Sequence, residues 1–249
     1  YTELDKWIVI KAKNLQEEVI KDYENFEIHL AFQKVLNFCT NELGGFYLDI
    51  IKDRLYTSKK EGIARRSAQS SMYQVYSSLL TLISPILSFT AEEAYLEKNG
   101  EGSSIFLSQW FDDWEEFDQR IDDDLWERLV SLKNNVNKEI EEKRNLGEVG
   151  SSLEAKVSLK CNDKSFIQLN DLKKELKFLF ISSDVDLSLD DKADNSHNDA
   201  IKIDVSKSDN SKCDRCWHFV DNLIPYQDEK ICSRCKDNID GSGEIRLFF

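Results

Sequence analysis

Apolar residues recur every three or four positions along the first part of the chain, which is the spacing of one face of a helix. Helices that follow one another without strands between them pack as an antiparallel bundle. We therefore predict a helical bundle, with Gly44-Gly45 as a break in its second helix. The predicted helices cover residues 4–23, 28–51 and 65–83, and a fourth has Pro85 in its first turn.

The period of the pattern changes near residue 150. Another amphipathic helix is predicted over residues 125–140, and then apolar and polar residues alternate from Leu153 to Cys161, as in a half-buried strand. These segments begin a small β-α-β-β unit. Its later parts are a helix over 169–179 and strands over 185–189 and 201–205, with a polar loop at 190–199.

The predicted fold class is mainly α, with a helical bundle, a small α+β unit and a module built on four cysteines. The last forty residues contain too few apolar residues to fold by hydrophobic burial alone. The expected domains are the bundle at 1–124, a long connecting helix at 125–149, the α+β unit at 150–206 and the cysteine module at 207–249.

Composition and charge narrow the classes of function. The chain has 249 residues, a formal net charge of −14 and a pI of about 4.8. Such an acidic chain is not expected to coat nucleic acid without specificity, although the balance allows a local basic face. It contains no run of 18 apolar residues, so no membrane span is expected. Its first residue is Tyr1 and its one methionine is Met72, which suggests a piece of a longer protein.

An acidic segment follows the bundle helices. Residues 112–127 contain nine acidic residues and one basic residue. Large aromatic residues are embedded in or beside this segment, among them Trp110, Trp114 and Phe117. Because such side chains favour burial, we expect the segment to pack on the fold as a loop.

Four cysteines form the strongest chemical signal. Cys213 and Cys216 make one Cys-x-x-Cys pair, and Cys232 and Cys235 make another after fifteen residues. Two residues between cysteines let one tight turn direct both sulfurs at a single ion, so the pattern predicts one structural zinc ion in a reducing compartment. The alternative is two redox dithiols, which is disfavoured because no such motif opens a helix in a βαβ unit here.

Basic and aromatic residues give two further candidate surfaces. The first is the run at 52–66, which contains six basic residues and two acidic ones. It is either a solvated loop or an edge that contacts phosphates. The second is Arg215 with Trp217, beside the second cysteine. Trp217 either covers the metal site or offers a flat face to an unstacked base. The six basic residues are Lys52, Arg54, Lys59, Lys60, Arg65 and Arg66.

The sequence contains no recognisable catalytic arrangement. It lacks a glycine-rich phosphate loop and a G-x-S-x-G motif, and it has three histidines. We interpret His29 as a packing residue of a helix and His218 as a neighbour of the metal site rather than a ligand. The residues therefore favour a binding or structural role over catalysis.

Several segments, in order, resemble the C-terminal part of the bacterial isoleucyl-tRNA synthetases, a class I aminoacyl-tRNA synthetase family. In the cysteine module, C-D-R-C-W-H at 213–218 and I-C-S-R-C at 231–235 favour the isoleucine enzymes over other class I synthetases, and G-S-G-E at 241–244 also fits. The other matching segments are FYLDIIKDRLYT at 46–57, RRSAQ at 65–69, PILSFTAEE at 85–93 and GSSLEA at 150–155.

The resemblance implies a helical anticodon-binding domain, a junction domain and a C-terminal zinc peptide. It implies that the parent is a cytoplasmic, ATP-using ligase of protein biosynthesis, which joins isoleucine to tRNA(Ile). The chain lacks the HIGH and KMSKS motifs of the nucleotide-binding domain and the editing domain, so it is expected to bind no ATP and to be inactive alone. Its expected partners are the anticodon stem-loop and the missing domains of the same protein, and it is expected to be a monomer.

The resemblance also makes Arg215 and Trp217 the preferred anticodon contacts, with the basic residues at 52–66 contacting the RNA backbone. Two alternatives stay open. One is a zinc-stapled structural or interaction module that reads no RNA, and the other is the same region of a different class I synthetase, such as the valine enzyme.

Overall fold

The computed structural model describes residues 1–190 and 201–249, so most of the predicted polar loop at 190–199 lies outside the described residues. The chain divides into two compact units. Unit 1 contains residues 1–51 and 66–120, and unit 2 contains residues 52–65 and 121–249. No helix in the described ranges is both long and apolar enough to cross a membrane.

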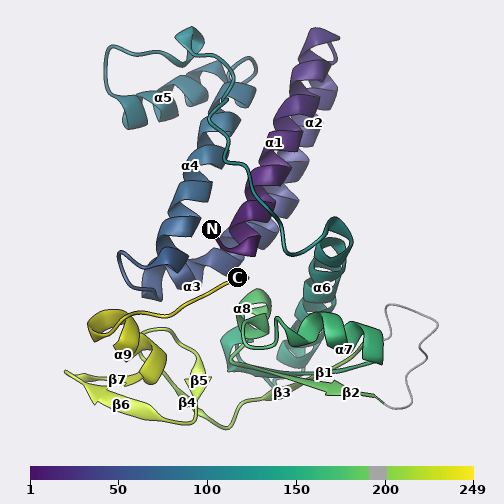
Figure 1. Ribbon diagram of the computed structural model, residues 1–249, viewed down its shortest axis with the longest axis vertical. Coiled ribbons are helices and arrows are strands. Elements are labelled where there is room, and N and C mark those ends of the chain that lie inside the picture. The colour runs from purple at the N-terminus through teal and green to yellow at the C-terminus, as the bar shows by residue number, and fades with distance from the viewer. Residues whose placement is uncertain (191–200) are drawn as a thin grey trace. The chain divides into compact units, whose positions relative to one another are not determined.

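Unit 1 is built from helices, as the periodicity predicts (Figure 1). Leu4, Ile8 and Val19 are fully buried on one face of the first helix, and Trp7 meets Phe46 edge to face at 5.1 Å between ring centroids. The helices in this part of the chain are α1 (Glu3–Glu24), α2 (Ile28–Asn37), η1 (Phe38–Leu48), α3 (Asp49–Thr57), α4 (Ile63–Ile83), α5 (Ser88–Asn99) and the short η2 (Ile105–Leu107). Residues 52–57 of α3 and 63–65 of α4 belong to unit 2.

The predicted break at Gly44-Gly45 is wrong, because helical structure continues from α2 through η1 into α3. Residues 38–48 form wide π-helical turns, which bring carbonyls close to residues five positions later. A Cβ on Gly44 would lie 2.8 Å from the carbonyl oxygen of Cys39. Glycine at this position therefore permits the wide turn rather than ending the helix.

Two other features of unit 1 test the sequence interpretation. Pro85 lies outside α5, which begins at Ser88, because residues 84–87 form turns that place Pro85 before the helix. The acidic segment packs on the fold as expected. Its neighbour Trp110 stacks on Tyr23 with 6.2 Å between centroids, and Phe117 contacts Tyr1 at 4.7 Å.

Unit 2 contains the predicted β-α-β-β unit (Figure 1). Strand β1 lies between the other two, parallel to β2 and antiparallel to β3, with Val157 opposite both Val185 and Val205. The single helix expected over 169–179 is wrong: two short helices are separated by turns at residues 171–175, and the first begins earlier, at Asp163, where Asn162 caps it. The elements are η3 (Ser152–Glu154), β1 (Ala155–Cys161), α7 (Asp163–Asn170), α8 (Leu176–Phe180), β2 (Asp184–Leu189) and β3 (Ile201–Lys207).

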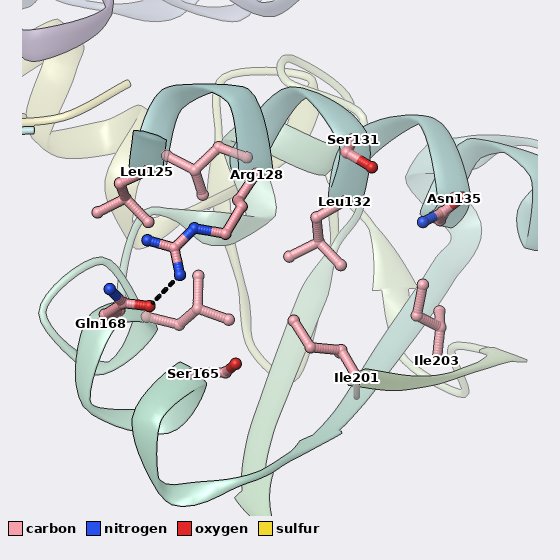
Figure 2. A pocket seen from close by; sticks show the side chains of 11 residues that line it. Leu125, Arg128, Ser131, Leu132, Asn135, Ser165, Gln168, Ile201 and Ile203 are labelled. Atoms are coloured by element: carbon pink, nitrogen blue, oxygen red, sulfur yellow. Dashed lines mark hydrogen bonds between the residues drawn. The ribbon is translucent and has the colours of Figure 1, made fainter. Parts of the chain in front are cut away.

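Helix α6 (Asp123–Asn145) precedes this sheet in the chain and packs against β3 and α8. Its apolar face and β3 border a small cavity of about 80 Å³, into which Leu132, Ile201 and Ile203 point (Figure 2). Arg128 spans its rim and donates a hydrogen bond to Gln168 on α7 at 2.7 Å. The cavity is a largely apolar seam between helix and sheet.

The final part of unit 2 is a small module of short elements. Its two-stranded sheets are β4 with β5 and β6 with β7, and helix α9 follows. The hairpin places Leu223 opposite Cys232 and Tyr226 opposite Glu229. The bounds are β4 (Ser211–Lys212), β5 (Phe219–Val220), β6 (Leu223–Tyr226), β7 (Glu229–Cys232) and α9 (Ser233–Asp240).

Candidate metal centre and nucleic-acid interface

The four predicted metal ligands, Cys213, Cys216, Cys232 and Cys235, lie together and are all buried. Their Sγ atoms lie within 4.8 Å of one another, with 3.9 Å between Cys213 and Cys235 and 3.8 Å between Cys216 and Cys232. A tetrahedral site with zinc–sulfur bonds of about 2.3 Å has sulfur–sulfur edges of about 3.8 Å. The four sulfurs can therefore hold one metal ion between them.

Local hydrogen bonds explain how the sequence positions these sulfurs. The turn between β4 and β5 is closed by bonds from Trp217 N to Cys213 O and from Cys213 N to His218 O, both 2.9 Å. Cys232 is the N-cap of α9, and its Sγ accepts a hydrogen bond from Cys235 N at 3.4 Å. One pair thus lies on a tight turn and the other on the first turn of a helix.

Hydrogen bonds link the cysteine side chains to one another. They lower the pKa of Cys232 and raise that of Cys235. The backbone N–H of Cys232 donates to Cys213 Sγ at 3.2 Å. His218 is buried, and its Nδ1 lies 3.3 Å from Cys216 O, but it is not one of the grouped ligands. Four cysteines are sufficient for a closed tetrahedral site.

The interior of the module consists mainly of the cysteines themselves. In its buried cluster Ile231 is the one residue that is not a cysteine, and Val220, Leu223 and Tyr226 cover the cluster only in part. So little apolar area cannot offset the conformational entropy of ordering about forty residues. The prediction that something besides hydrophobic burial holds this module is consistent with that composition.

Trp217 does not bury its indole over the metal-binding sulfurs. It leaves 58% of its surface exposed, and the ammonium of Lys212 lies 5.0 Å from the ring centroid. Its backbone has φ of 66°, in the left-handed region that large side chains rarely adopt. The turn therefore holds a strained tryptophan with an exposed aromatic face, and such strain is concentrated at functional sites.

Arg215 and Lys59 are occupied by contacts within unit 2. Arg215 donates to Thr57 O at 2.6 Å and, at 3.5 Å, to Tyr56 O, so its guanidinium joins the first cysteine turn to the end of α3. Lys59 donates to Gly241 O at 2.7 Å. Gly243 has φ of 85°, and a Cβ there would lie 3.0 Å from Lys59 Cβ, so glycine is needed for this close approach.

The other predicted basic contacts differ in exposure. Arg54 is completely buried and donates to Ala64 O at 3.1 Å, so it offers no guanidinium to a ligand outside the fold. Lys52, Lys60 and Arg66 are exposed, and Arg65 is half-buried. The sequence showed the charges of this run but not their partners, and the structure divides them between interior and surface.

A cluster of four charged residues, whose side chains are largely but not fully buried, was missed in the sequence. It contains Asp53, Arg234, Glu244 and Arg246, and we call it the Asp53 cluster. Arg234 on α9 donates two hydrogen bonds to the Asp53 carboxylate, at 2.7 and 2.8 Å. Arg246 also donates to Asp53, and its Nε lies 3.0 Å from Glu244. The cluster thus fastens α9 and the segment after it to α3.

Electrostatics within the Asp53 cluster is strongly favourable. Burial alone raises the pKa of Asp53, but hydrogen bonds from Arg234 and the charges of both arginines outweigh it and hold the pKa well below its ordinary range. Burial also raises the pKa of Glu244, but the charges of Arg246 and Arg234 outweigh this effect and lower the pKa to about 2. Both carboxylates are therefore ionised at neutral pH.

The segment at 244–249 extends this attachment to the α+β unit. Arg246 stacks 3.5 Å from the centroid of Phe178 on α8. Glu175 accepts backbone hydrogen bonds from residues 247, 248 and 249 at 2.8–2.9 Å. Asp53, Arg234 and Glu244 lie in the segments 46–57, 231–235 and 241–244 that carry the family resemblance. The sequence could not show that these three side chains contact one another, because the segments are far apart along the chain.

Comparison with known proteins agrees with the family resemblance of the sequence segments. Residues 5–159 match the family described as the anticodon-binding domain of tRNA ligase. The chain is 42% identical over 251 residues to an isoleucine–tRNA ligase of Legionella pneumophila, strain Paris, and 38% identical over 255 residues to one of Teredinibacter turnerae. These alignments cover 99% and 98% of this chain and 27% of each relative, so the chain spans about a quarter of their length.

Proposed function

Since the chain belongs to the family of anticodon-binding domains of tRNA ligases, we propose that it is the tRNA-recognition part of an isoleucine–tRNA ligase. The whole enzyme would join isoleucine to tRNA(Ile) with ATP, in domains outside this chain. The partners of this part are the anticodon stem-loop and the catalytic and editing domains of the same protein. The part alone is a cytoplasmic monomer without aminoacylation activity.

The metal in this proposal is one structural zinc ion. Zinc accepts four thiolates at tetrahedral corners, and such a site has no open position for water or substrate. The ion therefore acts by folding the module at 207–249 and does not take part in chemistry. Holding the turn that carries Trp217 is its contribution to RNA binding.

The exposed and strained Trp217 is the observation that carries the RNA-binding role. Anticodon bases lie in a single-stranded loop, and unstacked bases bind to flat aromatic faces. The ammonium of Lys212 beside the indole suits the negative charge of the RNA backbone. Lys52, Lys60, Arg65 and Arg66, none of which is fully buried, supply further backbone contacts in this proposal. Arg54, Lys59 and Arg215 take structural roles, because each donates to a backbone carbonyl of unit 2.

Each region has its own role in this proposal, and the roles follow the order of the regions along the chain. The bundle at 1–124 holds the anticodon stem and loop, and the helix at 125–149 with the α+β unit at 150–206 connects it to the zinc module at 207–249. This division follows the sequence, whereas the compact units group residues 52–65 with the later half of the chain.

The test measures zinc and RNA binding on the same zinc-loaded chain. An isoleucine tRNA anticodon stem-loop and a valine one are titrated at two salt concentrations, with and without Trp217→Ala. We expect one zinc per chain, tighter binding of the isoleucine stem-loop and about a tenfold loss with Trp217→Ala at unchanged zinc. Trp217→Phe, which keeps a flat ring, should bind within a few-fold of the unsubstituted chain.

Two other outcomes would favour the alternatives. One zinc per chain with no stem-loop binding would favour a structural module, and this alternative has some support in the balanced charge of the region, where residues 212–249 have six basic and seven acidic side chains. Tighter binding of the valine stem-loop would assign the chain to the valine enzymes instead.

A further inference from the structure

A second aromatic side chain lies exposed next to the metal-binding module. Tyr56 is in the last turn of α3 and leaves 78% of its surface exposed, while the next residue, Thr57, is buried. An aromatic ring stabilises a fold mainly through the area it buries. The Tyr56 ring therefore contributes little to packing, and its position calls for another explanation.

Arg215 connects Tyr56 to Trp217. The carbonyls of Tyr56 and Thr57 accept its guanidinium hydrogen bonds, and Trp217 follows two residues after Arg215 on the same turn. One side chain thus links two backbone segments, each of which carries an exposed aromatic ring. Exposed charges of both signs lie near these rings in sequence, with Lys60 and Glu61 after Tyr56 and Lys212 and Asp214 before Trp217.

The Asp53 cluster fixes the same two segments more firmly. Asp53 precedes Tyr56 by three residues, about one turn of helix, and it receives Arg234 from the metal-binding module and Arg246 from the segment after it. Ser58, just beyond Tyr56, donates to Glu244 at 2.8 Å. Contacts on both sides of Tyr56 therefore tie its segment to the module that carries Trp217.

We propose that Tyr56 and Trp217 form one aromatic surface that stacks on unpaired bases of an RNA loop, and that the Asp53 cluster holds its two parts together. The inference rests on the proposed function, because it takes the RNA to be the anticodon loop. Tyr56 is the added contact residue. Asp53 and Arg215 are positioning residues, which act on the RNA only through the placement of the two rings.

The first experiment tests Tyr56 as a contact. The zinc-loaded chain is titrated with the isoleucine anticodon stem-loop, and Tyr56→Ala is expected to weaken binding about tenfold, as loss of one stacked base does. Tyr56→Phe keeps the ring and should bind like the unsubstituted chain. Ile167→Ala, which removes a side chain that is 71% exposed on α7 in the connecting α+β unit, is the control and should change nothing.

The second experiment tests the Asp53 cluster through coupling between the two rings. In a double-mutant cycle, Tyr56→Ala and Trp217→Ala should be non-additive by about threefold or more. Asp53→Asn should retain zinc and lower affinity, and it should abolish this coupling. Arg234→Lys, which keeps the charge but not the two parallel bonds, replaces it if Asp53→Asn loses zinc. Glu148→Gln removes a surface partner of Lys143 and serves as the control.

The outcomes separate this inference from the proposed function. If Trp217→Ala weakens binding but Tyr56→Ala does not, the proposed function stands and the shared surface is overturned. If the coupling survives in Asp53→Asn at full zinc content, the cluster does not position the rings. If the unsubstituted chain binds no stem-loop at any salt concentration, both proposals fail.

Discussion

Hydroxyls contact a buried carboxylate in unit 1, and arginines contact a largely buried carboxylate in unit 2. Asp5 in unit 1 is fully buried and accepts hydrogen bonds from neutral hydroxyls, including Thr2 at 2.8 Å and Tyr47 at 2.7 Å. Asp53 in unit 2 is paired with two arginines. A hydroxyl partner keeps its hydrogen-bonding capacity at any ordinary pH, whereas an ion pair depends on the charge of both partners.

The same contrast extends to what surrounds the carboxylates. The helices of unit 1 bury a continuous set of aliphatic and aromatic side chains, whereas the metal-binding module buries four cysteines and Ile231. Stability of unit 1 therefore comes from apolar area and packing. With the proposed zinc ion bound, stability of the module comes from the metal and from charges, so we expect solution conditions to act on it more strongly. The predictions below test this contrast, from the largest expected effect to the smallest.

Removal of the metal is expected to give the largest effect. Structural zinc in small domains contributes roughly 10–16 kcal/mol of apparent binding free energy, which is also folding free energy. Chelation, or Cys232→Ser, should unfold residues 207–249 and leave the helices of unit 1 folded. Hydrogen exchange resolved by segment measures both. Cys39→Ser changes a half-buried cysteine of unit 1 that belongs to no metal group, so it is the control. If the backbone amides of residues 207–249 were equally protected from hydrogen exchange with and without metal, the prediction would be contradicted.

The Asp53 cluster should make unit 2 sensitive to acid through Glu244. Its pKa falls from an ordinary 4.5 to about 2 in the folded chain, so its stabilisation is complete above about pH 4.5 and is lost as the pH falls towards 2. Relative to Glu244→Gln, which keeps the shape, this carboxylate is worth at most about 3 kcal/mol at neutral pH. Unfolding free energies of both chains give the difference, measured from pH 7 down to the lowest pH at which each chain still holds one zinc ion, because protonated thiols release zinc. A difference that does not shrink in acid would refute the assignment.

The Asp5 network should respond to the loss of a single hydroxyl. Tyr47→Phe removes a buried hydrogen bond to a carboxylate and is expected to destabilise unit 1 by about 2 kcal/mol. Zinc content and exchange protection of residues 207–249 should not change. Tyr76→Phe, whose hydroxyl binds the carbonyl of Ala94 at an exposed position, is the matched control and should have a smaller effect. Urea unfolding of the two variants supplies the comparison.

The two regions also differ in how far the sequence predicts them. Apolar periodicity predicted α1, α4 and α6 and the alternating strands, because burial of one face dictates local structure. Cysteine spacing predicted the metal group, since two short motifs already carry the ligand geometry. Local signals failed at Gly44-Gly45, where the wide turns of η1 depend on close backbone contacts.

The charged residues were harder to place than the apolar ones. Arg54 and Lys59 read as surface charges in the sequence, but the structure gives them carbonyl partners at Ala64 and Gly241. Asp53 meets Arg234 across 181 positions of sequence. A charge count records the sign of a side chain but not its partner, and the partner is set only when distant segments come together.

The smallest expected effect concerns a single helix cap in unit 2. Asp122 accepts a hydrogen bond from Leu125 N at 2.8 Å at the start of α6, and its charge also suits the positive end of the helix dipole. Asp122→Ala should cost about 1 kcal/mol, whereas Asp122→Asn keeps the hydrogen bond and should lose only the smaller charge contribution. Because α6 belongs to unit 2, segment-resolved hydrogen exchange should show the change in α6 and not in α1. An equal loss of protection in α1 would mean that the two units unfold as one, and the contrast between them would then describe composition alone.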